Sequence, residues 1–158
     1  MLTEIYIKNF TIIDELHLEF QEGMHVLTGE TGAGKSITID AMELALGKRA
    51  STDVIRKGND RAEIAVLFDI TNIPLAKTFL QQNDIDNENE CMVRRILHKD
   101  GRSKSYINGS PATLQTLREL SEMLMDIHGQ HEFQTLTQAH KQRQLLDDFA
   151  QHGELTQQ

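Results

Sequence analysis

The residues best suited to chemistry are gathered in residues 29–36, whose sequence is GETGAGKS. Their spacing satisfies G-x-x-x-x-G-K-[ST] in full, and the fixed positions have physical causes. Gly32 and Gly34 let the backbone wrap closely around a diphosphate, where a side chain would collide or demand a forbidden φ. The spacing therefore predicts a loop that binds the phosphates of a nucleoside triphosphate.

Within such a loop the backbone N–H groups point at the anion, and the following helix adds the positive end of its dipole. Lys35 is predicted to bridge the outer phosphates, and the Ser36 hydroxyl to bind magnesium. ATP and Mg²⁺ are therefore the expected cofactors. The predicted nucleotide-binding residues of the loop are Gly29, Glu30, Thr31, Gly32, Ala33, Gly34, Lys35 and Ser36.

The elements around the loop must hold it in place. Apolar residues 24–29 predict a short strand that runs into the loop, and residues 36–46 predict a helix that ends at Gly47. Ahead of them, alternation in residues 2–10 and 15–20 predicts two amphipathic strands, paired antiparallel. The chain thus reaches its phosphate loop only after an antiparallel pair.

The remaining segments predict a mixed order of strands and helices. We expect a strand at residues 62–70, a helix at 74–82, and two strands within 91–109 joined by the Asp100-Gly101 turn. A further turn is expected at Asn108-Gly109, and then a helix capped by Ser110. Pro111 would then occupy the first position of that last helix. This order indicates a mixed α/β fold, with an antiparallel portion beside the phosphate-loop unit.

Hydrolysis of a triphosphate also needs a carboxylate at the end of an apolar strand to hold magnesium. Asp69 follows an apolar run, but no glutamate follows it, and the alternation with Glu63 favours a structural strand end. Asp126 is a similarly weak candidate. The sequence thus predicts the phosphate cradle but not the acidic half of a catalytic site.

A second polar group lies late in the chain, in DIHGQHEF. Gln130 lies in a loop that follows a predicted short strand. Its amide could reach the magnesium or the attacking water, and the alternative is that Gln130 is an ordinary loop residue. His128, His131 and Glu132 do not form the H-E-x-x-H helix motif, and surface histidines are favoured over a metal site.

Composition sets further bounds. The 158 residues fit one domain, and no apolar run approaches the roughly 18 residues needed to cross a bilayer. Cys91 is alone, which predicts a reducing cytoplasm. The net charge of −8 argues against general coating of nucleic acid. One basic cluster comprises Arg94, Arg95, His98, Lys99, Arg102 and Lys104. We interpret it as a solvated hairpin in preference to a surface that binds DNA or a partner.

Three longer stretches together resemble a known family. They are YIKNFTIIDELHLEFQEGMHVLTGETGAGKSITIDAMELALGKRAS, VIRKGNDRAEIAVLFDI and MDIHGQHEFQTL. They are similar to the amino-terminal part of the RecN family, bacterial DNA-repair ATPases related to SMC proteins. The pairing of GETGAGKS with DIHGQHE is far more specific than the phosphate loop alone.

The resemblance implies the amino-terminal lobe of a split ABC-type, SMC-like P-loop head over residues 1–137, with residues 138–158 as the start of a coiled-coil helix that is cut short. The signature motif and acidic strand would lie in a carboxy-terminal lobe beyond the coiled coil. The implied function is ATP binding within a protein of double-strand break repair and recombination, with head-to-head dimerisation gated by ATP. DNA would be a partner of the full-length protein, in a bacterial cytoplasm close to the nucleoid, with no membrane.

The resemblance also implies roles for single residues. Lys35 and Gln130 would be catalytic, with Gln130 as the glutamine-loop residue near magnesium. Lys8 and Asn9 fall where related heads contact the base or sugar, and Phe10 is as well explained as core. Arg56 falls where related heads place an arginine that contacts DNA or the opposing nucleotide.

One position departs from the family, which more often has histidine where this chain has Phe133. The full-length protein is expected to be an ATPase, and this stretch alone to hydrolyse ATP near background. The alternative is a free-standing small P-loop kinase, although such kinases usually place the loop after the first strand.

Overall fold

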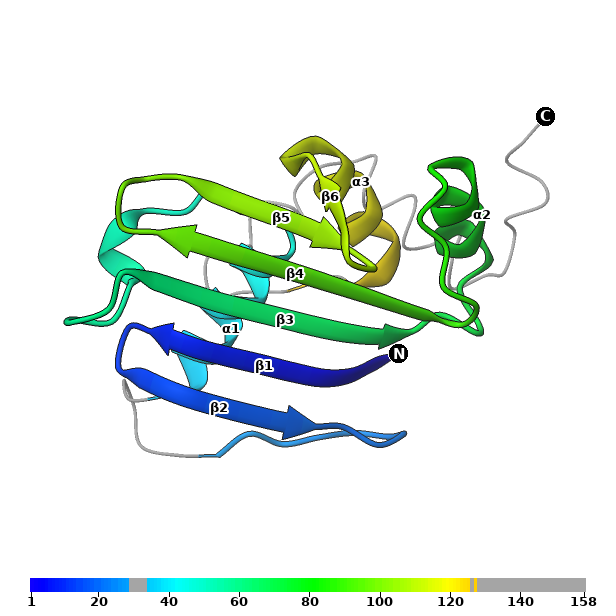
Figure 1. The fold of residues 1–158 in the computed structure, drawn as a ribbon. Coiled ribbons are helices and arrows are strands. Elements are labelled where there is room, and N and C mark those ends of the chain that lie inside the picture. Colours follow the sequence, from blue (N-terminus) through cyan, green and yellow to red (C-terminus); the bar gives the residue numbers. More distant parts are fainter. Residues whose placement is uncertain (29–33, 126, 128–158) are drawn as a thin grey trace, which may run out of the picture. The chain divides into compact units, whose positions relative to one another are not determined.

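The computed structural model describes residues 1–28, 34–125 and 127. The chain divides into two compact units, Met1–Asp126 and Ile127–Gln158, and Ile127 is the only described residue of the second. The first unit is built on a six-stranded sheet in which every neighbouring pair of strands is antiparallel (Figure 1). Among the described residues, no helix has the length and apolar character needed to cross a membrane.

The first two strands form one edge of the sheet. β1 (Leu2–Phe10) pairs with β2 (Ile13–Glu19), which places Ile5 opposite Leu18. Ile5 and Ile7 are fully buried, while the polar residues that alternate with them lie on the other face. The predicted antiparallel pair is confirmed, and β2 begins two residues earlier than predicted.

Four strands complete the sheet: β3 (Arg61–Asp69), β4 (Glu90–His98), β5 (Ser103–Ile107) and β6 (Ser110–Ala112). Their order is β2-β1-β3-β4-β5-β6, so β3 lies between β1 and β4 (Figure 1). The predicted turn at Asn108-Gly109 joins β5 to β6, with φ of 48° and 82°. Positive φ at both positions is what a two-residue hairpin turn requires.

Three helices and a short 3₁₀ turn pack around the sheet: α1 (Lys35–Ala45), α2 (Pro74–Gln82), α3 (Leu114–Leu124) and η1 (Thr52–Val54). α1 contacts β1, β3 and β4 and lies behind the sheet in the view of Figure 1, and α3 contacts β5. The predicted helices at the positions of α1 and α2 are confirmed. The buried core lies between the inner sheet face and these helices.

The predicted strand at residues 24–29 is wrong for the residues that are described. Residues 24–28 belong to no strand, and Met24, Val26 and Leu27 are 93%, 77% and 53% exposed. An apolar run becomes a strand only where a neighbour satisfies its backbone N–H and C=O groups. No described strand pairs with this segment.

The predicted start of the last helix is also wrong. Ser110 and Pro111 lie in β6, and α3 is capped by Thr113, whose Oγ1 accepts a hydrogen bond of 3.1 Å from the N–H of Thr116. Pro111 is tolerated because β6 is an edge strand, where a missing N–H need break no ladder bond.

The C-terminal end of α1 is held by a buried arginine of β4. Arg95 is 1% exposed, and its Nη1 donates to the carbonyl oxygens of Leu44 at 2.6 Å and Lys48 at 2.5 Å. Its Nε donates to Ser103 Oγ at 3.1 Å. The Leu44 carbonyl also accepts from the Gly47 N–H at 3.2 Å, so Arg95 adds a charged donor to a helix end that a backbone bond already closes.

Two side chains of α3 bind the same helix end. Arg118 Nε donates to the carbonyl oxygen of Gly47 at 2.9 Å, and Ser121 Oγ donates to that of Leu46 at 2.7 Å. Burial, and next the positive charge of Arg118, lower the pKa of Arg95, although an arginine stays protonated at neutral pH. Arg95, Arg118 and Ser121 are together called the α1 clamp.

A glycine at this helix end provides the first test. Gly47 has φ +106°, and a Cβ there would lie 2.7 Å from Cγ of Arg118. We expect Gly47→Ala to lower the free energy of unfolding by about 2 to 3 kcal/mol, because it adds backbone strain and displaces Arg118. Urea denaturation measures the change.

The matched control is Gly58→Ala. Gly58 has φ +88°, and no heavy atom lies within 4 Å of the place that a Cβ would take, so this variant isolates the backbone strain. We expect a loss of about 1 kcal/mol there. Equal losses at both sites would show that contact with Arg118 contributes nothing.

The single cysteine gives a second test. Cys91 is fully buried, and burial raises the pKa of its thiol to about 12. We expect no reaction with Ellman's reagent at pH 8 in the native state, and full reaction in denaturant. Rapid labelling of the native chain would contradict the burial of β4.

Candidate nucleotide-binding site

The described end of the phosphate loop is the N-terminus of α1. Gly34 is the N-cap, and Lys35 and Ser36 are the first two helical residues, Lys35 half-buried and Ser36 next to it in the first turn. Both the N–H and the hydroxyl of Thr38 donate to the Gly34 carbonyl at 3.0 Å, which fixes the first turn. Residues 29–33 lie outside the described part of the chain.

The chemistry of this helix end favours an anion. Among the residues that the structure describes, no side chain caps the α1 N-terminus, and the first turn of α1 holds no acidic residue. α3 differs, because the Thr113 side chain caps it. The first N–H groups of a helix and its dipole attract negative charge, and Lys35 adds a cation there. The donor set therefore fits phosphate, and the Ser36 hydroxyl fits a magnesium ligand.

The structure brings Asn9 and Arg56 together. The Arg56 N–H donates to the Asn9 carbonyl at 2.9 Å, and Phe10 forms a β-bridge with Ile55. Asn9 has φ +53°, a conformation that asparagine adopts more readily than most residues. The guanidinium of Arg56 lies 3.9 Å from Asp14, and both side chains are exposed. Two predicted site segments, far apart in sequence, thus share one end of the sheet.

The two residues beside Asn9 lie in different environments. Lys8 lies on the outer sheet face, 3.4 Å from Glu15, and this carboxylate raises the pKa of Lys8. Glu15 also accepts a hydrogen bond of 3.0 Å from the Tyr6 hydroxyl. Phe10 is fully buried, which supports the interpretation of Phe10 as a core residue.

Several predicted residues lie outside the described part of the chain. They are Gly29, Glu30, Thr31, Gly32, Ala33, Asp126, His128, Gln130, His131, Glu132 and Phe133. Among the described residues, no group of three or more His, Cys, Asp or Glu side chains is arranged to hold a metal ion.

Asp69 is accounted for by local structure. It ends β3, and its Oδ1 accepts hydrogen bonds from the Thr71 N–H at 2.8 Å and the Thr71 hydroxyl at 2.6 Å. These bonds, the hydroxyl first, lower the pKa of Asp69. β3 is antiparallel to both neighbours, which supports the structural strand end over a magnesium ligand.

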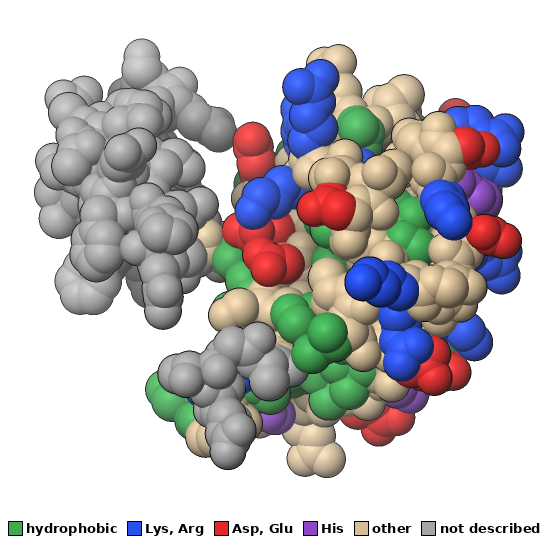
Figure 2. Space-filling view, turned by 90° about the vertical axis from the view of Figure 1, so that its left-hand side faces the viewer, with side chains coloured by type: hydrophobic (Ala, Val, Ile, Leu, Met, Phe, Trp, Pro, Cys, Tyr) green, Lys and Arg blue, Asp and Glu red, His purple; other side chains and the backbone are tan. Residues whose placement is uncertain are grey.

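The basic cluster at residues 94–104 is divided among different environments. Arg95 is buried in the α1 clamp, and Arg94 binds Glu63 at 2.7 Å while its guanidinium lies over the Tyr106 ring at 5.8 Å. Arg102 binds Asp100 at 2.7 Å. Figure 2 shows Lys and Arg side chains interspersed with acidic ones at this end of the sheet. Because it is buried, Arg95 belongs neither to a solvated hairpin nor to a partner surface.

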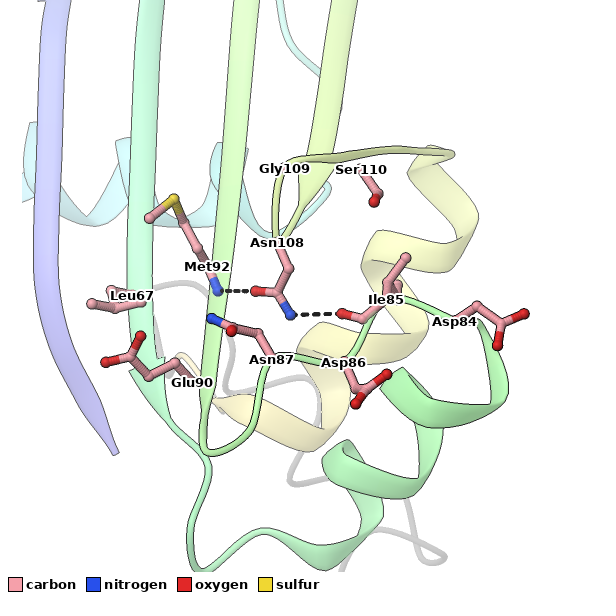
Figure 3. A pocket seen from close by; sticks show the side chains of 10 residues that line it. All are labelled: Leu67, Asp84, Ile85, Asp86, Asn87, Glu90, Met92, Asn108, Gly109 and Ser110. Carbon is pink, nitrogen blue, oxygen red and sulfur yellow. Dashed lines mark hydrogen bonds between the residues drawn. The ribbon is translucent and has the colours of Figure 1, made fainter.

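A cavity of about 470 Å³ lies at the opposite end of the sheet, where β3 ends and β4 begins (Figure 3). The Asn108 side chain organises it, because Oδ1 accepts from the Met92 N–H at 2.8 Å and Nδ2 donates to the Ile85 carbonyl at 2.7 Å. Its charged lining is acidic, from Asp84, Asp86 and Glu90. Such a lining repels phosphate, so this cavity is not the nucleotide site.

The α1 clamp was missed by sequence reasoning. Alternation along β4 places Arg95 on the same face as Cys91, Val93 and Leu97, all buried. This alternation could have predicted that Arg95 faces inward, but the neighbouring basic residues favoured the interpretation of a surface cluster. Arg118 and Ser121 carried no comparable signal.

Solved structures show the same fold. One, described as "Structural biochemistry of ATP-driven dimerization and DNA stimulated activation of SMC ATPases", matches with a TM-score of 0.66 and 24% identity over 94% of this chain and 98% of that one. The crystal structure of the SmcHead bound to the C-winged helix domain of ScpA matches with a TM-score of 0.63 and 26% identity, over 77% of this chain and 40% of that one. The first unit therefore has the mixed α/β fold of a P-loop ATPase head lobe, as predicted.

The family follows from the sequence. A family model described as "AAA domain" matches residues 4–157, and the chain belongs to this family. The DNA repair protein RecN of Vibrio cholerae is 46% identical over 155 residues, which cover 98% of this chain and 28% of that protein. The predicted resemblance to RecN is confirmed, and the chain spans little more than a quarter of the length of this relative.

The role of Asp69 can be tested by Asp69→Asn. We expect ATP affinity to be unchanged and thermal stability to fall slightly, because the Thr71 bonds lose a charged acceptor. A carboxylate whose pKa is lower in the folded state stabilises the fold at pH values above its unfolded pKa. This contribution is lost as the pH falls through the folded pKa. The difference in Tm between variant and unchanged chain should therefore shrink below about pH 4. Loss of ATP binding in the variant would instead favour the small kinase.

Proposed function

We propose that this chain is the ATP-binding amino-terminal lobe, residues 1–137, of a RecN-like DNA-repair ATPase, and that residues 138–158 begin its coiled coil. One observation carries the proposal. α1 begins at the Lys35 of a complete G-x-x-x-x-G-K-S motif, and among the described residues no side chain caps its N-terminus and no acidic residue lies in its first turn. The identity to RecN supports the choice of this family over other phosphate-loop proteins.

Lys35 would bind the outer phosphates of ATP, and Ser36 and Gln130 would hold magnesium, which neutralises charge that develops on the phosphates. Lys8 and Asn9 would contact the base or sugar. Arg56 would contact DNA or the nucleotide of an opposing head, and its position beside Asn9 supports a place at the edge of the same site.

A second lobe of the same protein would complete the head. Three apolar side chains between β2 and α1 are exposed in the described chain, those of Met24, Val26 and Leu27. Exposed apolar side chains spaced this closely are typical of a surface that another element covers. The carboxy-terminal lobe of a RecN-like protein would cover it and supply the missing acidic strand.

Head pairing and DNA binding complete the proposal. The structural relative is described by ATP-driven dimerisation and DNA-stimulated activation, and we extend both to the full-length form of this protein. ATP shared between two heads would make dimerisation depend on bound nucleotide. The protein would act in the bacterial cytoplasm near the nucleoid, in double-strand break repair and recombination.

Lys35→Ala tests nucleotide binding directly. We expect the 158-residue chain to bind a fluorescent ATP analogue weakly, and the variant to bind at least about tenfold more weakly with an unchanged Tm, because a cation beside the phosphates is removed. Lys99→Ala is the control, since Lys99 is an exposed lysine in the β4–β5 turn.

Hydrolysis separates the lobe from a complete enzyme. The chain alone should hydrolyse ATP near background, and the protein with both lobes should hydrolyse it measurably. Strong turnover by the 158-residue chain, abolished by Lys35→Ala, would refute the proposal of an incomplete head.

A further inference from the structure

We infer that the α1 clamp is a positioning device for nucleotide binding, in which the buried charge of Arg95 strengthens the hold of the opposite end of α1 on phosphate. The inference rests on the proposed function and concerns residues that do not touch the nucleotide. The clamp acts both through geometry and through charge.

The geometric effect follows from the hydrogen bonds. α1 carries Lys35 at its first position, and its direction determines where this side chain lies. The other end of the helix is fixed by donors from two separate elements, Arg95 of β4 and the α3 residues Arg118 and Ser121. A helix held at its end by both the sheet and a second helix has little freedom to tilt. The clamp bonds together therefore fix the direction of α1, and the loss of one neutral bond is expected to leave Lys35 close to its place.

The electrostatic effect follows from the helix dipole. The C-terminus of a helix carries about half a negative charge, which opposes anion binding at the N-terminus. Arg95 and Arg118 place two cations on that negative end. Arg95 is 1% exposed, so solvent screens its charge far less than a surface charge.

The length of α1 sets the size of the effect. The 11 residues of the helix span about 16 Å at a rise of about 1.5 Å per residue. A unit charge at that distance, with an effective dielectric constant of about 20, changes the affinity for one negative charge about fivefold. We therefore expect loss of the Arg95 charge to raise Kd for ATP about fivefold.

Arg94 provides the matched control. It neighbours Arg95 in β4 but faces the outer surface, where it binds Glu63 at 2.7 Å. Arg94→Gln and Arg95→Gln remove the same formal charge from the same strand. If only net charge mattered, both substitutions would weaken ATP binding equally.

The experiment measures Kd for a fluorescent ATP analogue and Tm for the 158-residue chain and its variants, at a temperature where each is folded. We expect Arg95→Gln to raise Kd about fivefold and Arg94→Gln to leave it within about twofold. Arg95→Lys should restore most of the affinity but not the Tm, because it keeps the charge and loses the forked donors. A purely structural role would not separate affinity from Tm in this way.

A second pair covers the case in which Arg95 variants do not fold. Arg118→Met removes a charge from the helix end, and Ser121→Ala removes a hydrogen bond and no charge. We expect Arg118→Met to raise Kd about threefold and Ser121→Ala to leave Kd within about twofold of the unchanged chain. This difference should hold even if the two variants have similar Tm values. Equal Kd values for Arg118→Met, Ser121→Ala and the unchanged chain would overturn the inference.

The two proposals fail differently. If the Lys35→Ala variant binds ATP as tightly as the unchanged chain, the proposed nucleotide site is wrong. If Lys35→Ala abolishes binding while the clamp variants, folded, bind as tightly as the unchanged chain, the site stands and the role of the clamp is refuted.

Discussion

The contact between the Arg95 guanidinium and the last carbonyls of α1 is the constraint on which the other packing depends. A buried cation is stable only when its donors are satisfied, and here the satisfied acceptors are carbonyls of a helix end and a serine hydroxyl. Removing the guanidinium would take away the hydrogen bonds that β4 donates to Leu44, Lys48 and Ser103. A hydrogen bond to a charged group contributes about 1.5 to 3 kcal/mol, which is a sizeable part of the stability of a domain. The same contact joins α1 to the sheet, and Arg118 and Ser121 join the neighbouring Gly47 and Leu46 to α3.

This arrangement divides α1 into two ends with different tasks. At the first end, the N–H groups of the first turn and the Lys35 cation favour an anion. At the last end, cations from β4 and α3 occupy the negative pole. The sheet is divided in the same way. Asn9 and Arg56 meet at one end of it, whereas the acidic cavity around Asn108 lies at the other.

Much of this lobe could be predicted from sequence, because alternation and turn chemistry are local. The pattern of Ile5 and Ile7 and the Asn108-Gly109 turn were sufficient to predict β1 and the turn that follows β5. The clustering of basic residues was less informative than the alternation of residues along β4. The clustering placed Arg95 in a basic hairpin, whereas its position in β4 points it inward. Ser110 and Thr113 are both good cap residues, and only the pairing of β6 with β5 decides between them.

Of the candidate site, the phosphate loop and its helix were identifiable from spacing alone. The state of residues 24–28 was not, because a strand depends on partners that no local pattern encodes. The contact between Asn9 and Arg56 was equally hidden, since it joins segments almost fifty residues apart. For Gln130 the family resemblance remains the basis of the prediction.

The pairing of β1 with β3 has a consequence for how the chain folds and varies. β3 to β6 follow one another in sequence and in space, so their hairpins can form early. Lys8 pairs with Glu63, and closing this loop of about fifty residues costs roughly 3.5 kcal/mol of chain entropy. Each doubling of such a loop adds only about 0.6 kcal/mol. The connections on either side of α1 can therefore lengthen during evolution with little effect on the sheet. We expect the β1–β3 pairing to form after the more local pairs among β3 to β6.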